Sequence, residues 1–411
     1  MKRIGAIDTL RGFALLGILL MNVMSFSMPG AAYSNPAAFG GDDWLNRAVY
    51  GVVHLVADQK FMGLFSLLFG ASVMLHIQSR EKKGQKTAWF HYVRNFWLLI
   101  IGTAHAVFIW DGDILTVYAL SSFVLYLLRG LSPKWQLVLG LLIFFSPAVV
   151  YVGSSVVVAE ASPAELAALE AEWQPGETAV SEEIAFYQGD YWSQVISRFG
   201  EESDSGGEAV DLYYLSFLVD FFARALGMML IGMASYSWGI VAAKRSDAFY
   251  RRLVVVGCGG GRPLAGVGLW LNQAMGWSAT YSPFVGRIPN LLATPLVVFG
   301  YVGLIMLWSR TPLWAGLQAR LAATGRMALT NYIGQSLLGT FVFYGFGLGL
   351  FGSVNRIGQL GVVLLIWLLQ LWLSPIWLRH FRYGPLEWAW RSLSHFRLQP
   401  LRRAAVAQKV G

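Results

Sequence analysis

Residues 289–308 read PNLLATPLVVFGYVGLIMLW, a stretch of twenty residues without a charged side chain. An α-helix rises about 1.5 Å per residue, so this stretch is about as long as the hydrocarbon core of a bilayer is thick. It therefore predicts a membrane-spanning helix. Further spans are predicted near 10–28, 61–79, 94–110, 113–129, 135–159, 213–240, 252–272, 327–350 and 357–378.

The composition of the 411-residue chain agrees with a membrane protein. Hydrophobic residues make up 56% and charged residues only 13%, whereas soluble domains are about 25% charged. Disordered chains are polar and poor in aromatic residues, so disorder is excluded as well. The predicted fold is all-α, a polytopic transmembrane helix bundle of about ten spans. Within the stretch 252–272, several glycines and Pro263 predict an interruption of the helix.

The distribution of basic residues predicts the orientation of the spans, because cytoplasmic loops are enriched in Lys and Arg. With a cytoplasmic N-terminus, most of the 31 basic residues fall in inner segments. Outer segments hold only Arg47, Lys60, Arg198, Arg287 and Arg356. Both termini are therefore predicted to be cytoplasmic. The net charge of +8 is explained by these loops, which argues against nucleic acid as a partner.

We expect four parts along the chain. They are an N-terminal half of five spans (1–159), an acidic external loop (160–211), a C-terminal half of five spans (212–380) and a basic cytoplasmic tail (381–411). Ser162 and Pro163 predict a capped helix at the start of the loop. The loop is interpreted as an acidic, solvated cover, or alternatively as a lid or a recruiting surface. The basic start resembles a signal peptide, but Asp8 and Arg11 favour a retained first helix.

Ionisable side chains inside predicted spans are costly to bury and therefore indicate functional sites. His105 lies in the outer half of the third span, close to the turn Asp111-Gly112-Asp113. A carboxylate beside the imidazole would orient the ring and raise its basicity. We therefore predict His105, Asp111 and Asp113 as catalytic residues. The alternative is a packing histidine beside an ordinary polar turn.

Two further pairs lie on single helix faces. Asp220 and Arg224 are four residues apart on the sixth span, where the arginine would meet an anionic group or form a structural ion pair. Asn331 and Gln335 are one turn apart on the ninth span. These amides would line a substrate site or bond neighbouring helices together.

Polar groups also flank the first and last helices. Asp8 and Arg11 lie at the inner end of the first span, and Asn22 follows Arg11 by about three turns, so both point the same way. Near the C-terminus, Pro385 and Glu387 suit a helix start beside tryptophans that favour the membrane interface. Interfacial anchoring is the alternative for both regions.

Several familiar sites are not predicted. The single cysteine, Cys258, excludes an intramolecular disulfide and a cysteine-based metal site. The histidines have no metal-binding spacing, and the glycines at 257–261 lack the ending of a phosphate loop. No metal and no tightly bound cofactor are therefore expected.

Short motifs over nearly the whole chain resemble one bacterial family. They are Ile7-Asp8-Thr9-Leu10-Arg11-Gly12 with Met21-Asn22, Lys60-Phe61 through Leu67-Leu68-Phe69-Gly70, the His105 to Leu115 segment, Gly325-Arg326-Met327 through Asn331-Tyr332, Gln335-Ser336, and Tyr383-Gly384-Pro385-Leu386-Glu387-Trp388. The sequence resembles the YeiB-like inner-membrane proteins, which carry a domain of unknown function. This resemblance implies a multi-pass protein of the bacterial inner (cytoplasmic) membrane.

The N-terminal half also looks like that of membrane acyltransferases, including enzymes that pass acetyl from cytosolic acetyl-CoA to sugars across the bilayer. In those enzymes an Asp-x-x-Arg-Gly helix and an embedded histidine matter. Asp8, Arg11 and Asn22 match the first element. The histidine is not at the corresponding place here, and His105 on another helix would have to replace it.

Three functions are weighed. In the first, an acyltransferase, acyl-CoA docks at Arg11, Arg326 and Asn331, and His105 activates a glycan, lipid or small acceptor. The second is a proton-coupled transporter of a small anion or amphiphile, and the third is a membrane scaffold. The predicted substrate-binding residues are Asp8, Arg11, Asn22, Lys60, Asp220, Arg224, Arg326, Asn331, Gln335 and Glu387. The oligomeric state stays open.

Overall fold

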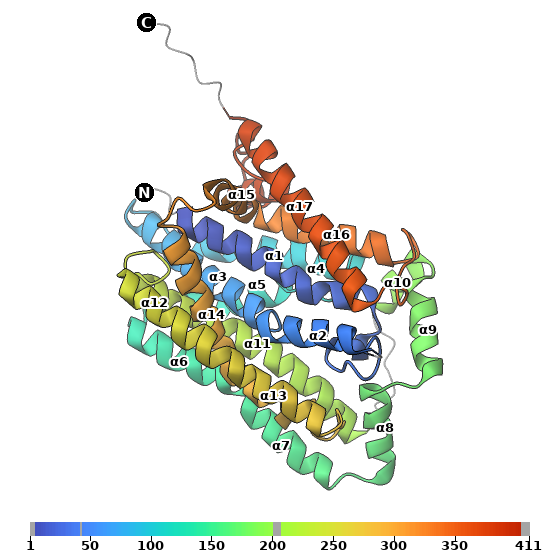
Figure 1. Ribbon diagram of the computed structural model, residues 1–411. Coiled ribbons are helices and arrows are strands. Elements are labelled where there is room, and N and C mark those ends of the chain that lie inside the picture. Colours follow the sequence, from blue (N-terminus) through green and yellow to red (C-terminus); the bar gives the residue numbers. More distant parts are fainter. Residues whose placement is uncertain (1–4, 42, 200–206, 404–411) are drawn as a thin grey trace, which may run out of the picture.

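The computed structural model describes residues 5–41, 43–199 and 207–403, and these ranges fold into helices without a strand (Figure 1). The all-α prediction is confirmed. In chain order the helices are α1 (Gly5–Ser27), α2 (Trp44–Val56), α3 (Lys60–Glu81), α4 (Ala88–Phe108), α5 (Leu115–Leu127), α6 (Pro133–Phe145), α7 (Pro147–Ala159), α8 (Pro163–Trp173), α9 (Glu177–Tyr187), α10 (Tyr191–Ser197), α11 (Glu208–Ser237), α12 (Asp247–Val256), α13 (Arg262–Ala274), α14 (Ile288–Trp308), α15 (Ala315–Arg326), α16 (Ala328–Phe343), α17 (Arg356–His380) and α18 (Pro385–Ser394).

Among the described residues, seven helical segments are long and apolar enough to cross a membrane. They coincide with seven of the predicted spans, and their bounds are Gly5–Ser27, Trp44–Glu81, Pro133–Ala159, Glu208–Ser237, Asp247–Ala274, Val285–Trp308 and Arg356–His380. The other three predicted spans correspond to α4, α5 and α16, of which α5 has only 13 residues and α16 only 16. The total of ten spans therefore stays a prediction.

The predicted break within 252–272 is wrong. A π-helical turn at Gly257–Gly261 joins α12 to α13, so the helix continues through the glycines. The reason is close packing against α14: a Cβ atom at Gly257 would lie 2.3 Å from the carbonyl oxygen of Leu296. The missing side chains admit the neighbouring backbone instead of ending the helix.

The predicted external loop is mostly helical. Helices α8, α9 and α10 run along one end of the molecule, away from both chain termini (Figure 1). The predicted cap is confirmed, because the Ser162 hydroxyl accepts a bond from the amide of Glu165 and the Glu165 carboxylate accepts one from the amide of Ser162. Part of the loop, 200–206, lies outside the described residues.

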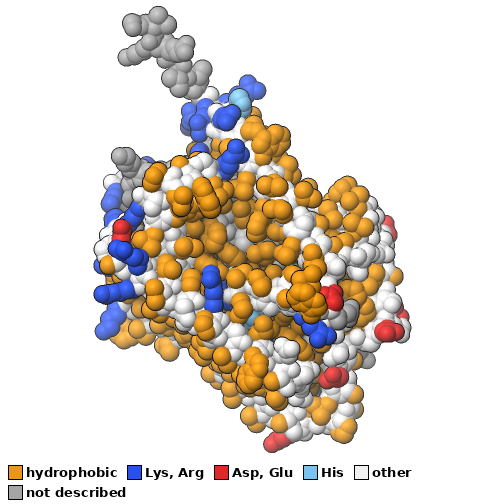
Figure 2. Space-filling view, in the orientation of Figure 1, with side chains coloured by type: hydrophobic (Ala, Val, Ile, Leu, Met, Phe, Trp, Pro, Cys, Tyr) orange, Lys and Arg blue, Asp and Glu red, His pale blue; other side chains and the backbone are white. Residues whose placement is uncertain are grey.

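Charges are separated on the visible face of the molecule. Figure 2 shows hydrophobic side chains over its broad middle, Lys and Arg near the two chain termini, and Asp and Glu near α8 to α10. This separation agrees with the predicted orientation, in which the basic end faces the cytoplasm. We call the two ends of the molecule the basic end and the acidic end.

Candidate functional site

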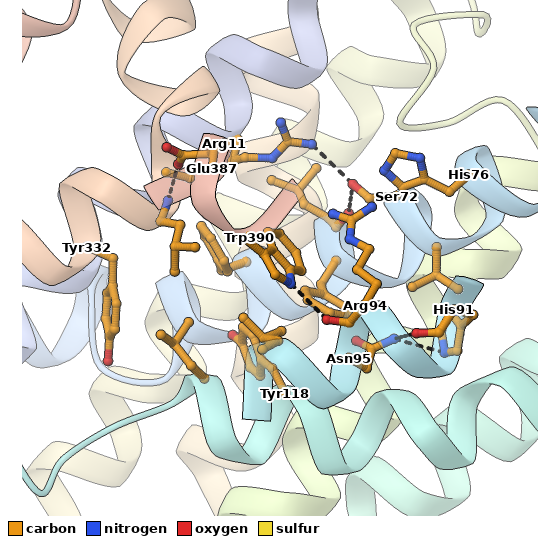
Figure 3. A pocket seen from close by; sticks show the side chains of 18 of the residues that line it. Arg11, Ser72, His76, His91, Arg94, Asn95, Tyr118, Tyr332, Glu387 and Trp390 are labelled. Carbon is orange, nitrogen blue, oxygen red and sulfur yellow. Dashed lines mark hydrogen bonds between the residues drawn. The ribbon is translucent and has the colours of Figure 1, made fainter. Parts of the chain in front are cut away.

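A cavity of about 230 Å³ lies at the basic end, between α1, α3, α4, α5, α15, α16 and α18 (Figure 3). We call it the inner cavity. Four guanidinium groups line it, those of Arg11, Arg80, Arg94 and Arg326. Within the part of the chain that the structure describes, Glu387 is the one acidic residue in its lining. Because arginine binds phosphate and carboxylate groups with paired N–H donors, this part of the cavity suits an anionic group.

The first helix holds Arg11 at the cavity wall. Its Nη1 donates to Asp8 Oδ1 one turn earlier (3.2 Å), and its Nη2 donates to Ser72 Oγ on α3 (3.1 Å). Asp8 itself is 6% exposed and is not among the residues that line the cavity. Of the predicted pair, Arg11 therefore faces the cavity and Asp8 positions it.

Helix α18 closes one side of the inner cavity. Glu387 accepts hydrogen bonds from the backbone amides of Leu329 (2.7 Å) and Thr330 (3.1 Å), which are orphan donors at the start of α16. Trp390 donates from Nε1 to the carbonyl oxygen of Arg94 (2.8 Å), and the Arg94 guanidinium lies 4.1 Å from the indole ring centre. Burial raises the pKa of the Glu387 carboxyl, although its hydrogen bonds oppose this shift.

Beyond the arginines the inner cavity becomes apolar. Phe65, Leu68, Leu98 and Leu115 belong to this part of the lining. The lining also includes Tyr118 and Tyr332, both almost completely buried. A cationic mouth leading to an apolar interior suits an amphiphile with an anionic head and a long, weakly polar arm.

His105 and Asp113 form a buried pair between α4 and the start of α5. The imidazole Nδ1 lies 2.8 Å from Asp113 Oδ1, and both side chains are 1% exposed. The second carboxylate oxygen accepts the amide of Thr116 (2.7 Å), which fixes the aspartate at the first turn of α5. A carboxylate oxygen accepts the hydrogen bond, so Nδ1 carries the hydrogen, and in a neutral ring Nε2 would then hold the lone pair. Within the described residues Nε2 has no hydrogen-bond partner.

The second predicted carboxylate lies elsewhere. Asp111 is exposed and lines a surface pocket with Arg198 at the acidic end. Of the two predicted partners, the structure brings only Asp113 to the imidazole. The ring centre of Tyr332 lies 5.3 Å from that of His105, and Tyr332 lines the inner cavity whereas His105 does not.

Two smaller cavities continue from the inner cavity toward the acidic end. The intermediate cavity, about 50 Å³, shares Ile18, Ile114 and Tyr332 with the inner cavity. The outer cavity, about 60 Å³, shares Met21, Tyr33 and Gln59 with the intermediate cavity. The three voids therefore follow one another through the molecule.

One face of α1 lines this series of cavities. Arg11 lines the inner cavity, Ile18 both the inner and the intermediate one, and Asn22 the intermediate one. The spacing of seven and four residues keeps all three on one helical face. The structure therefore agrees with the predicted shared direction of Arg11 and Asn22.

The predicted pair on α11 belongs to a buried ion network. Arg224 donates from Nε to Asp220 Oδ1, and Arg287 donates from Nη2 to Asp220 Oδ2 (3.0 Å). Asp220 and Arg224 are at most 1% exposed. Both arginines line the outer cavity, although one carboxylate already compensates part of their charge.

Lys60 lies in a second network beside the outer cavity. Its Nζ donates to the His54 carbonyl oxygen (2.7 Å) and to Asn290 Oδ1. Asn290 donates to Asp58 Oδ2 (2.7 Å), which also lies 3.0 Å from His54 Nδ1. Lys60 is completely buried and is not among the residues that line the outer cavity. Its network partners His54, Asp58 and Asn290 do line it.

The amides predicted on α16 face another helix. Asn331 donates to the carbonyl oxygen of Thr324 (3.1 Å) and to Ser374 Oγ (3.0 Å), and Gln335 donates to Gln370 Oε1 (2.9 Å). Neither Asn331 nor Gln335 is among the residues that line the inner cavity. The bonds to Ser374 and Gln370 hold α16 to α17, the bond to Thr324 reaches α15, and a role in substrate binding stays a prediction.

Some cavity residues were missed by the sequence analysis. The sequence places Arg80 and Arg94 only among the basic residues of inner segments, and Arg287 only among those of outer segments, without a role in a site. His54 and Asp58 are four residues apart, a spacing that could have indicated their pairing. Among the described residues, no three His, Cys, Asp or Glu side chains gather as a metal site.

Comparison with known proteins gives a consistent result. Residues 236–397 match the family described as "Protein of unknown function (DUF418)". The chain is 32% identical over 402 residues to the uncharacterized protein YeiB of Escherichia coli, covering 96% of this chain and 97% of that protein. It is 30% identical over 407 residues to the uncharacterized protein YxaH of Bacillus subtilis, covering 97% and 96%.

Proposed function

The chain belongs to the YeiB-like family of uncharacterized bacterial proteins, and from its geometry we propose that it is a membrane acyltransferase. It would lie in the bacterial inner membrane with the inner cavity open to the cytosol. The acyl group would pass from cytosolic acyl-CoA to a hydroxyl or amine of a glycan, lipid or small acceptor. The earlier likeness to membrane acyltransferases supports this choice.

The inner cavity is the proposed donor site. Arg11, Arg94 and Arg326 suit the phosphates of coenzyme A, because guanidinium groups pair with phosphate oxygens. The apolar interior suits the pantetheine arm and the acyl chain. The volume of about 230 Å³ is too small for the whole donor, so the nucleotide stays at the basic mouth.

His105 is the proposed general base. Its Nε2 takes the proton of the acceptor, whose oxygen or nitrogen attacks the thioester carbonyl. The carbon–sulfur bond then breaks, and the coenzyme A thiolate takes the proton from the imidazolium. Asp113 keeps the imidazole in the required tautomer and stabilises its charged form.

One observation carries the proposal: Nε2 of the buried His105–Asp113 pair has no partner among the described residues, beside Tyr332 in the wall of the donor cavity. A buried polar atom without a hydrogen bond is costly, and such atoms occur at catalytic sites. His105 is 2% exposed, so an acceptor reaches it only after neighbouring side chains move.

The test is acyl transfer by the protein in lipid nanodiscs, with labelled acetyl-CoA and a periplasmic glycan fraction. We expect the wild type to label an acceptor, and His105→Gln to lose at least about 100-fold in rate. His380→Gln, at the exposed end of α17, is the matched control and should keep the wild-type rate. Equal turnover in His105→Gln would refute the proposal.

A proton-coupled transporter is the second candidate, favoured by the series of cavities with shared lining residues. In that case His105, Asp113, Asp220 and Arg224 would relay protons and substrate. Proteoliposome flux separates the candidates, since transport depends on a pH gradient and needs no acyl donor. An acyltransferase gives no net uptake without one.

A further inference from the structure

Buried polar atoms without partners gather around the outer cavity. They are Gln59 Oε1, Asn272 Oδ1, Ser282 Oγ and Arg287 Nη1. None of these atoms has a hydrogen-bond partner among the described residues, and no residue with such an atom lines the inner cavity. A buried polar group without a hydrogen bond lowers stability, so four such groups around one void indicate a polar occupant.

Two of these groups are held in place by their other bonds. Asn272 donates from Nδ2 to the carbonyl oxygens of Gly268 (2.9 Å) and Gly286 (3.0 Å), which leaves Oδ1 as its available acceptor. A Cβ atom at Gly286 would lie 2.4 Å from this oxygen, so only glycine leaves it room. Arg287 is fixed through Nη2 by Asp220, and its Nη1 remains available.

Gln59 lies at the junction of the outer and intermediate cavities. Its φ of 61° falls in the left-handed region, which is unfavourable for a residue with a side chain. Strain of this kind concentrates at functional sites, because the surrounding structure must maintain it. The neighbouring Asp58 and Lys60 both bond Asn290, and these bonds hold the segment in place.

The available atoms define the chemistry of the occupant. Two are pure acceptors, one is a cationic donor, and the serine hydroxyl can do either. The two acceptors disfavour an anion, and Asp220 compensates part of the charge of Arg224 and Arg287. Hydroxyl groups donate and accept at once, and aromatic rings such as those of Tyr50 and Trp277 pack against the C–H groups that carry them.

We propose that the outer cavity binds the hydroxyl-bearing end of a polyol, such as a sugar or the glycerol group of a lipid. The void of about 60 Å³ holds about two waters, so it accepts a terminal group of this ligand. A whole sugar ring requires α8 to move, since Trp173 lines the cavity and bonds the Trp277 carbonyl oxygen. The acceptor role of this ligand rests on the proposed acyl transfer, whereas its binding does not.

The test measures binding to the full chain without an acyl donor. The protein is placed in phosphatidylcholine nanodiscs, and glycerol, maltoside and glucoside detergents are excluded. One arm adds glucose and uses saturation-transfer NMR. The other adds phosphatidylglycerol and uses native mass spectrometry, so the two arms distinguish a free polyol from a lipid headgroup.

Two variants remove an unpartnered atom from the cavity wall: Ser282→Ala removes Oγ, and Gln59→Met removes Oε1 together with the rest of the amide while keeping the side-chain length. We expect each to weaken binding of the responding probe about tenfold. Neither breaks a described hydrogen bond of the altered group, so the unfolding temperature without ligand should not fall. Ser154→Ala on α7 is the matched control, because Ser154 Oγ is also buried and unpartnered but does not line the outer cavity.

The outcomes are distinct. Binding of either probe that is weakened about tenfold in both cavity variants and unchanged in Ser154→Ala supports the proposal. Failure of both probes to bind the wild type, or equal binding by all variants, overturns it and leaves water as the occupant. If the protein binds the polyol but transfers no acyl group, the proposed function is refuted, whereas the polyol site is supported.

Discussion

Gly12 of α1 and Gly325 of α15 lie against each other with no side chain between them. A Cβ atom at Gly325 would come within 2.6 Å of the amide nitrogen of Gly12, and one at Gly12 would lie 2.0 Å from the carbonyl oxygen of Leu321. This close contact places the neighbours Arg11 and Arg326 in the lining of one cavity. The glycines of two separate sequence motifs therefore build the cationic mouth together.

Gly12→Ala should destabilise the protein. The added methyl group meets backbone rather than a flexible side chain, so the helices must separate at a cost of about 1–3 kcal/mol or more. Thermal unfolding in nanodiscs measures the loss. Gly361→Ala on α17 is the matched control: a Cβ atom there meets nothing within 4 Å, and the helix propensity of alanine should keep or raise stability. Equal stability of the two variants would contradict the close contact.

Asp113→Asn should reduce acyl transfer by about 100-fold or more. The amide of asparagine donates to Nδ1 and so favours the hydrogen on Nε2, which removes the base without removing the ring. The rate with labelled acetyl-CoA measures the effect. Asp111→Asn is the control, because Asp111 is exposed and the structure pairs His105 with Asp113. Loss of activity in Asp111→Asn alone would reverse the assignment.

Arg94→Gln should weaken acetyl-CoA binding about tenfold or more, because a hydrogen bond to a charged group contributes about 1.5–3 kcal/mol. Titration of the protein in nanodiscs at low and high salt measures the affinity, and the salt dependence should decrease with the lost charge. Arg129→Gln is the matched control. Arg129 stacks on Tyr126 and is not among the residues that line the inner cavity. Equal weakening by both variants would indicate a general charge effect.

Glu387 should make stability decrease with rising pH. Burial raises the pKa of its carboxyl above the usual value, so the folded protein binds more protons than the unfolded chain between these two values. The free energy of unfolding therefore falls as pH rises through that window, beginning at the ordinary pKa of about 4.5. Unfolding temperatures from pH 4 upward, at roughly half-unit steps, measure this dependence.

Glu387→Gln should remove this part of the pH dependence, because the glutamine side chain does not titrate. Its amide oxygen can still accept hydrogen bonds from the backbone amides of Leu329 and Thr330, so the contact between α18 and α16 is kept. Glu170→Gln, on an exposed part of α8, should leave the dependence unchanged. If the wild type instead gains stability relative to Glu387→Gln as pH rises, the hydrogen bonds to the carboxylate outweigh its burial.

The sequence alone determined the helical membrane fold, the separation of charge and the pairing of His105 with a nearby aspartate. These features depend on composition, on runs of apolar residues and on groups close together in the chain, such as His105 and Asp113, eight residues apart. Hydropathy also located the seven helical segments long and apolar enough to cross a membrane. Hydropathy could not distinguish a helix that breaks at the glycines 257–261 from a continuous helix that packs closely on its neighbour.

The tertiary structure decided which polar side chains share a cavity. Asn290 bonds Asp58 across 232 residues, and Gln335 faces Gln370 on α17 rather than the inner cavity. A helix can turn any of its faces toward several neighbours with similar local energy, so spacing within one helix does not say which partner it meets. That choice is made by the fit of side chains and glycine contacts between helices, which exists only once the bundle is packed.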